Sequence, residues 1–299
     1  MIPMTPEPTI DAHHHVWELA RIPWLRGPMQ PRIFGDYAGL RRDYGVEEFK
    51  RDIAPFGITA SVYIQLNVAP GDEVDETAWV QQQADVHGRP DGIVAFADLA
   101  APDVGAVLDR HLRFANMRGI RQQIHWHENP QYRFAPRPDV MNDAAWRRGL
   151  AELESRGLSF DLQVFPGQMA DAARLAQDFP GVRFVLLHAG MLEDRSPAGW
   201  AAWRSGMRAL AACPNVWVKL SGLGTFVRTC SVDLWRPVVA ETLDIFGPAR
   251  CMYGSNYPIE SLWTSYRQLF ETMQECLVGL ADTDRRRVLH GTAADFYRL

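Results

Sequence analysis

Two histidines separated by one residue, His13 and His15, stand in a strand-like run at residues 10–17. Successive side chains of a strand point to opposite faces, so His13 and His15 share one face while His14 takes the other. Two imidazoles on one face can bind a divalent cation through neutral nitrogens, or can hold and activate a water molecule. A purely structural histidine cluster is the alternative. We expect a chemical role, because histidine is rarely placed twice on one strand face without a partner.

A second group of polar residues follows the apolar run that begins near Arg118. A period of two places four of its side chains on one face: Arg121, Gln123, His125 and His127. If that face lines a cavity, Arg121 can hold a substrate carboxylate through paired hydrogen bonds. The alternative is that Arg121 pairs internally with Asp161 or Asp98 and holds the fold together. We assign Arg121, His125, His127 and the nearby Gln163 to substrate binding.

Aromatic residues and one lysine have alternative roles. Trp17 and Tyr257, together with Trp24, stand where loops would crowd a cavity, and they could stack on a ring-shaped substrate. Packing in the core is the alternative, and we assign Trp17 and Tyr257 to substrate binding. Lys219 can pair with a carboxylate inside the fold or form an imine with a carbonyl substrate, and the ion pair is the expected role.

The composition is that of an ordinary globular enzyme. The 299 residues are 22% charged, with a formal net charge of −5, which provides no basic field for binding nucleic acid. The four cysteines form no CxxC pair, and no run is long enough to span a bilayer. Because the N-terminal residues lack the features of a secretory signal, we expect a cytoplasmic protein. The expected partner is a small acidic molecule that Arg121 can hold. The sequence predicts no oligomeric state.

The elements that would position these residues alternate between strands and helices. Eight apolar or β-branched runs recur, each followed by a stretch with the 3.6-residue periodicity of an amphipathic helix. They begin near Ile10, Ile58, Ile93, Arg118, Leu158, Arg183, Val216 and Cys251. Eight such units predict a (β/α)8 TIM barrel with its site at the carboxyl ends of the strands. We expect a flexible tail at residues 1–8, a single barrel domain at 9–299, and a long loop over the mouth at 16–45.

Several motifs, taken in order, resemble the amidohydrolase-related family of the amidohydrolase superfamily, including L-fuconolactonases and 2-pyrone-4,6-dicarboxylate lactonases. The first is the Asp-x-His-x-His pattern at residues 11–15, which in that family begins the first strand. Others follow at residues 40–44, 118–121, 187–190, 219–223, 253–258 and 292–297. The resemblance extends over essentially the whole chain and implies a barrel hydrolase. It assigns catalytic roles to His13, His15 and His188.

At one position the sequence departs from the family. The acid that family members carry near the end of the eighth strand, where it accepts a proton from the attacking water, falls on Asn256. An amide cannot act as that base, so the proton would pass to His188, to one of the first two histidines or to Glu260. A histidine has an unperturbed pKa suited to this role near neutrality. For Glu260 we expect instead a solvated loop carboxylate.

The same departure leaves metal use open. His13 and His15 could ligate one zinc ion, but the strand-five run has no imidazole, and an amide oxygen is a poor substitute for a carboxylate ligand. Metal-dependent and metal-independent catalysis are both compatible with the sequence. The favoured function is water-mediated opening of a small carboxylate-bearing lactone, with His13, His15, His188 and Asn256 at the reacting centre. The alternatives are a zinc-dependent decarboxylase of an aromatic or unsaturated acid and a catalytically impaired barrel that binds a small molecule.

Overall fold

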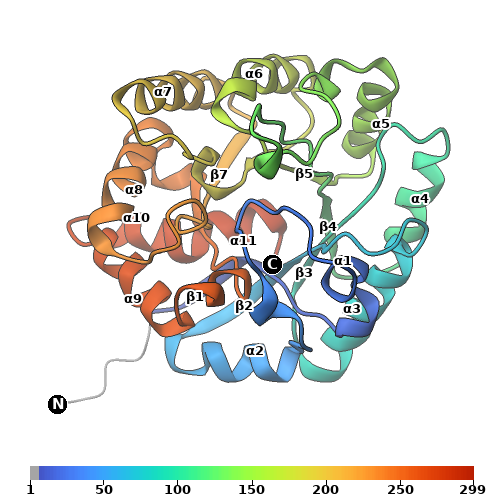
Figure 1. The fold of residues 1–299 in the computed structure, drawn as a ribbon, viewed down its shortest axis with the longest axis horizontal. Helices are drawn as coiled ribbons and strands as arrows, with labels where there is room; N and C mark the ends of the chain where they lie inside the picture. Colours follow the sequence, from blue (N-terminus) through green and yellow to red (C-terminus); the bar gives the residue numbers. More distant parts are fainter. Residues whose placement is uncertain (1–6) are drawn as a thin grey trace.

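Within residues 7–299, which the computed structural model describes, eight parallel strands pair in the order β1 to β8 (Figure 1). Each strand begins within one residue of the position expected from the apolar runs, and the predicted TIM barrel is confirmed. Most of the predicted tail at residues 1–8 lies outside the described residues. The strands are β1 (Thr9–His14), β2 (Ile58–Ile64), β3 (Gly92–Ala95), β4 (Met117–Ile120), β5 (Ser159–Leu162), β6 (Phe184–Leu186), β7 (Val216–Leu220) and β8 (Cys251–Tyr253).

Helices form a ring around the strands (Figure 1). None of the helices in residues 7–299 combines the length and the apolar character that crossing a membrane requires. The helices are α1 (Pro23–Arg26), α2 (Val46–Ile53), α3 (Glu73–His87), α4 (Val104–His111), α5 (Ala144–Ser155), α6 (Met169–Asp178), α7 (Pro197–Ala211), α8 (Val232–Phe246), α9 (Tyr266–Cys276), α10 (Asp282–Arg286) and α11 (Thr292–Tyr297).

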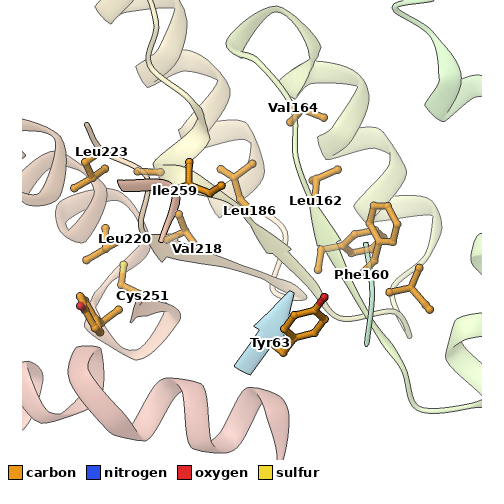
Figure 2. Packing of buried hydrophobic residues seen from close by; sticks show 14 of the residues in the cluster. Tyr63, Phe160, Leu162, Val164, Leu186, Val218, Leu220, Leu223, Cys251 and Ile259 are labelled. Atoms are coloured by element: carbon orange, nitrogen blue, oxygen red, sulfur yellow. The ribbon is translucent and has the colours of Figure 1, made fainter. Parts of the chain in front are cut away.

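Alternate strand residues form the core between the barrel and its helices. Figure 2 shows this layer, in which Phe160 and Leu162 of β5 and Val218 and Leu220 of β7 are fully buried. Their neighbours along each strand point to the inside of the barrel. The apolar part of that interior packs against the C-terminal helix α11, which supplies Phe296 and Tyr297. One end of the barrel is therefore filled, and the other is left for a site.

A buried ion pair lies inside the barrel between β5 and β7. Lys219 Nζ lies 2.7 Å from Asp161 Oδ2, and both side chains are inaccessible to solvent. The Tyr297 hydroxyl donates to the same carboxylate at 3.0 Å. Lys219 thus pairs with a carboxylate, as expected, and the contact joins two strands to α11. Since each charge is buried, each depends on the other to offset the loss of hydration.

The connection from β1 to α2 lies over the mouth of the barrel, as expected from its irregular sequence. It contains only the short helix α1 and two turns of 3-10 helix, at Leu19–Arg21 and Ala38–Leu40. In Figure 1 this blue segment lies over the middle of the ring of strands. Trp24 anchors it by donating from Nε1 to the Leu66 carbonyl at 2.8 Å, just beyond β2.

Replacing Lys219 by methionine should destabilise the protein by about 3–5 kcal/mol, because Asp161 would remain buried without its cation. Urea denaturation monitored by circular dichroism would measure the loss. The double variant Lys219→Met with Asp161→Leu is the control, since it removes both charges. We expect it to recover most of the lost stability, and a double variant as unstable as the single one would contradict this account.

Candidate active site

A pocket opens at the carboxyl ends of the strands, beneath the long connection between β1 and α2. Its walls come from the ends of several strands and from the loops that follow them. Six residues assigned from the sequence line it: His15, Arg121, His125, Gln163, His188 and Asn256. Carboxyl ends of the strands are where barrel enzymes place their active sites.

An irregularity in β1 turns its histidines into the barrel. Ile10 and Ala12 face the interior, and strict alternation would then place His13 outside. The pairing of β1 with β2 shifts between Asp11 and His14, and beyond this bulge His13 and His15 face inward. His14 takes the other face, where its ring stacks on Phe49 at 3.9 Å between centroids. The predicted sharing of one face by His13 and His15 is confirmed.

Three imidazoles meet at the base of the pocket. The His13 ring lies 5.2 Å from that of His15 and 4.8 Å from that of His188, measured between centroids. His15 and His188 line the pocket, whereas His13 lies beneath them and is fully buried. Two glycines leave space for this arrangement, because a Cβ on Gly254 would meet His13 Cβ at 2.7 Å and one on Gly222 would meet His188 Nδ1 at 2.5 Å.

Hydrogen bonds orient the two rings that line the pocket. His15 Nδ1 lies 2.7 Å from the Ile64 carbonyl, which can only accept, so Nδ1 carries the proton and Nε2 carries the lone pair. His188 Nδ1 lies 3.0 Å from the Ser221 hydroxyl, which leaves Nε2 free toward the pocket. Neither ring nitrogen of His13 has a protein partner. Because buried polar atoms are nearly always hydrogen-bonded, we expect a small ligand such as water to bind between the rings.

All three imidazoles are neutral at pH 7. Burial lowers the pKa of His15 to about 3, and the charge of Arg121 lowers it further. Burial also lowers the pKa of His13 and that of His188 well below the usual value, with Lys219 and Arg121 respectively as the next causes. Burial and nearby cations thus lower these pKa values below the unperturbed value that suits a histidine to proton transfer near neutrality. Neutral rings can accept a proton, but only weakly while the nearby cations are unpaired.

Asn256 is hydrogen-bonded to a buried acid. Its backbone amide donates to the His13 carbonyl at 2.7 Å, and its side-chain Nδ2 donates to Glu260 Oε1 at 3.4 Å. Glu260 also accepts from Trp263 Nε1 at 2.8 Å and is fully buried. The interpretation of Glu260 as a solvated loop carboxylate is therefore wrong. Burial raises its pKa to about 8, so the carboxyl group is largely protonated at neutrality.

Arg121 enters the pocket without an acidic partner. Its Nη2 donates to the Gln65 carbonyl, while its Nε is buried without a protein partner. The proposed internal partners are occupied elsewhere, since Asp161 pairs with Lys219 and Asp98 accepts from Gln122. Burial lowers the pKa of Arg121 to about 10, so it remains charged at pH 7. A buried guanidinium with a free N–H is a site for an anion.

Three residues assigned to substrate binding do not line this pocket. His127 lies 3.5 Å from Glu193, with its ring against Phe165. Trp17 donates from Nε1 to the Arg42 carbonyl at 2.6 Å and is buried in the core. Tyr257 packs between other tyrosines, with centroids 5.9 Å from Tyr44 and 5.4 Å from Tyr266. Core packing, the alternative considered for the aromatic residues, describes both Trp17 and Tyr257.

Other lining residues were not identified from the sequence. Arg32 and Phe34 of the long connection contribute to the wall, as do Asn67 after β2 and Phe134 after β4. Their loops have no periodicity from which side-chain direction could be inferred. The only signal was the length of the first connection, which predicted a loop over the mouth.

A metal ion fits the residues of this site poorly. Within residues 7–299, no group of three or more His, Cys, Asp or Glu side chains is arranged to hold one. The position suited to an anionic ligand carries the neutral Asn256, and the nearest acid, Glu260, is engaged in hydrogen bonds. Three imidazoles with a water can make a catalytic zinc site, but the rings of His13, His15 and His188 are not arranged as such a group among the described residues.

The sequence matches a family model described as Amidohydrolase over residues 10–299. The uncharacterized protein y4mH of Sinorhizobium fredii is 39% identical, with 97% of this chain and 98% of that protein covered. An L-fucono-1,5-lactonase of Burkholderia multivorans is 29% identical over 97% of this chain and 96% of its own length. A crystal structure of an amidohydrolase from Burkholderia multivorans with bound zinc has a TM-score of 0.82 at 28% identity, covering 98% of this chain and 99% of that one.

The buried carboxyl of Glu260 should make stability depend on pH. Burial raises its pKa from the usual 4.5 to about 8, so the stability that the protonated group contributes is fully present below pH 4.5 and is lost as the pH rises through 8. We expect Glu260→Gln to remove this dependence, so that its destabilisation relative to wild type shrinks by about 2–4 kcal/mol between pH 5 and pH 9. Urea denaturation at both pH values would measure it, and a difference that does not change with pH would refute the assignment.

Proposed function

The chain belongs to the amidohydrolase family, and from this premise we propose that it hydrolyses a small lactone that carries a carboxylate. The observation that carries the proposal is that Arg121, buried and without an acidic partner, lines the same pocket as the neutral imidazoles of His15 and His188. Arg121 is suited to a substrate carboxylate, and the imidazoles are suited to a water molecule beside the ester. Relatives of 29% and 28% identity named L-fucono-1,5-lactonase support a cyclic ester as the substrate.

Binding of the substrate would prepare the base. The charge of Arg121 is the largest cause, after burial, of the lowered pKa of His188. A carboxylate paired with Arg121 cancels much of that charge, so the pKa of His188 rises toward its usual range once the substrate is bound. His188 Nε2 then accepts a proton from the water, while Ser221 Oγ, 3.0 Å from Nδ1, accepts the proton on the other nitrogen and holds the ring.

The remaining groups orient the reacting atoms. Water oxygen bonds to the acyl carbon, and the bond from that carbon to the ring oxygen breaks as His188 returns its proton to the leaving alkoxide. Asn256 has one side-chain N–H on Glu260, which leaves its second N–H for the carbonyl oxygen and Oδ1 for the water. The neutral His13, which lies beneath His15 and His188, supplies a hydrogen bond to the water or other small ligand that binds between the three rings. Charge that develops on the carbonyl oxygen is met by donors already in place.

The direct test combines metal analysis with a panel of lactones. Purified protein is analysed for metals and then assayed with 2-pyrone-4,6-dicarboxylate and with sugar-acid lactones that keep a free carboxylate. The neutral L-fucono-1,5-lactone serves for comparison. We expect the carboxylated lactones to be opened at least tenfold more efficiently than the neutral one, with turnover unchanged after dialysis against a chelator. Stoichiometric zinc with chelator-sensitive opening of a lactone would favour metal-dependent hydrolysis, whereas stoichiometric zinc without lactone opening would favour the decarboxylase alternative. Binding without turnover of any lactone would favour a non-catalytic barrel.

Two buried histidines provide a matched pair of variants. His188→Gln removes the proposed base, and we expect kcat to fall by about 10²–10⁴. His14→Phe is the control, because His14 is also buried but stacks on Phe49 outside the pocket, and the turnover of this variant should match that of wild type. Steady-state kinetics on the best lactone of the panel, with circular dichroism to check folding, would compare them. Equal losses in both variants would contradict the role given to His188.

A further inference from the structure

A second cavity, of about 370 Å³, lies between the beginning of the connection over the mouth and helix α3. It is lined by residues between 16 and 26 of that connection, by Tyr63 of β2, and by α3 with the loop before it; Figure 1 shows α1 close to α3. Among the described residues, none lines both this cavity and the active-site pocket. Its volume lies within the range of small-molecule sites, roughly 300–1,000 Å³.

Acids outnumber cations in the walls of this cavity, whereas the active-site pocket is lined by arginines and, among the described residues, by no acid. The charged lining residues are Glu18, Asp72, Asp75, Glu76, Arg21 and Arg26. Arg21 is already engaged, because its Nε lies 2.9 Å from Glu18 Oε2 and its guanidinium carbon lies 5.4 Å from the centroid of the Trp79 ring. Three acids and one arginine remain, so the cavity favours a positively charged ligand.

Glu76 is the buried acid of this cavity. It is 5% exposed, whereas the other three acids of the lining are exposed. Its Oε1 accepts from the Tyr63 hydroxyl and from the Leu66 backbone amide, both at 2.8 Å, while its Oε2 is buried without a hydrogen-bond partner among the described residues. Such an oxygen is unfavourable, and burial raises the pKa of Glu76. A cation that binds from the cavity would pair with Oε2 and favour the ionised carboxylate.

The rest of the lining favours an organic cation over a metal ion. The acids of the described residues include no group of three that could hold a metal. Aromatic side chains line the cavity beside the acids instead, and Trp17, Tyr63 and Trp79 are all buried. Aromatic rings attract ammonium groups and pack against apolar stems. A primary amine with a short apolar body would use both the carboxylate and the rings.

We propose that this cavity binds a small organic amine, with the ammonium group on Glu76 Oε2 and the apolar body against the aromatic side chains. The proposal does not depend on the reaction proposed above. The site lies next to the anchor of the connection over the mouth, because Leu66 donates from its amide to Glu76 and accepts at its carbonyl from Trp24 Nε1. Since the connection also forms one wall of the cavity, a bound amine would hold this connection in place over the active site.

Two probes that differ only in charge test the site. Phenethylamine and 2-phenylethanol share a ring and a two-carbon stem, but the first ends in an ammonium group and the second in a hydroxyl. By titration calorimetry we expect wild-type protein to bind the amine about tenfold or more tightly than the alcohol. Glu76→Gln keeps Oε1 for Tyr63 and Leu66 but replaces Oε2 by an amide nitrogen that cannot accept, so the two affinities should become similar.

Glu73→Gln is the matched control, because Glu73 lies in the same first turn of α3 but does not line the cavity, and its preference for the amine should stay as in wild type. Hydrogen–deuterium exchange locates the bound amine in the wild-type protein without any variant. We expect slower exchange at residues 16–26 and in the first turns of α3. Equal affinities of wild type for the two probes, a preference that survives Glu76→Gln, or protection only around the active-site pocket would each overturn the proposal.

Discussion

Both the Asp11 carboxylate and backbone hydrogen bonds join β1 to β8 and close the barrel. Asp11 Oδ1 accepts from the backbone amides of Ser255 at 2.8 Å and His13 at 3.2 Å, and its Oδ2 accepts from the Tyr266 hydroxyl at 3.1 Å. The contacts to Ser255 and His13 lie where β1 bulges, so one acid both joins the first strand to the last and holds the irregular backbone. Beyond the bulge, the backbone amide of Asn256 donates to the His13 carbonyl, and the backbone amide of His15 donates to the Tyr257 carbonyl. These contacts between β1 and the end of β8 therefore fix the histidines and Asn256 relative to one another.

From its closed end to its mouth, the barrel interior changes from apolar to charged. Phe296 and Tyr297 of α11 fill the closed end, and the Lys219–Asp161 pair lies next to them. Above this pair come neutral imidazoles and then Arg121 and Arg32. Asp161 neutralises Lys219, but nothing among the lining residues neutralises the two arginines. An excess of positive charge in a desolvated cavity lowers the pKa of every nearby imidazole, and it is relieved only when an anion enters.

The barrel could be predicted because apolar runs and helical periodicity depend only on burial, which repeats regularly along the chain. The shared face of His13 and His15 followed from the period of a strand. The bulge that turns this face inward could not be predicted, since it depends on contacts of Asp11 with residues more than two hundred positions away. The directions of side chains in loops cannot be predicted from periodicity either. Arg32 could not be identified as a lining residue for this reason. Trp17 and Tyr257 have sizes that suit either stacking on a substrate or packing in the core, and both are packed in the core.

Glu260 gives a physical reason for an amide at position 256. An aspartate there would place a second carboxyl group about where Asn256 Nδ2 now lies, 3.4 Å from Glu260 Oε1. Two carboxyl groups at that distance cannot both ionise, so one would stay protonated and neither would be an independent base. The amide avoids this conflict, because it donates to Glu260 and thereby directs Oδ1 away from that acid. The departure from the family pattern and the buried acid four residues later are thus consistent parts of one arrangement. In the reaction proposed above, this arrangement leaves the proton from water to an imidazole.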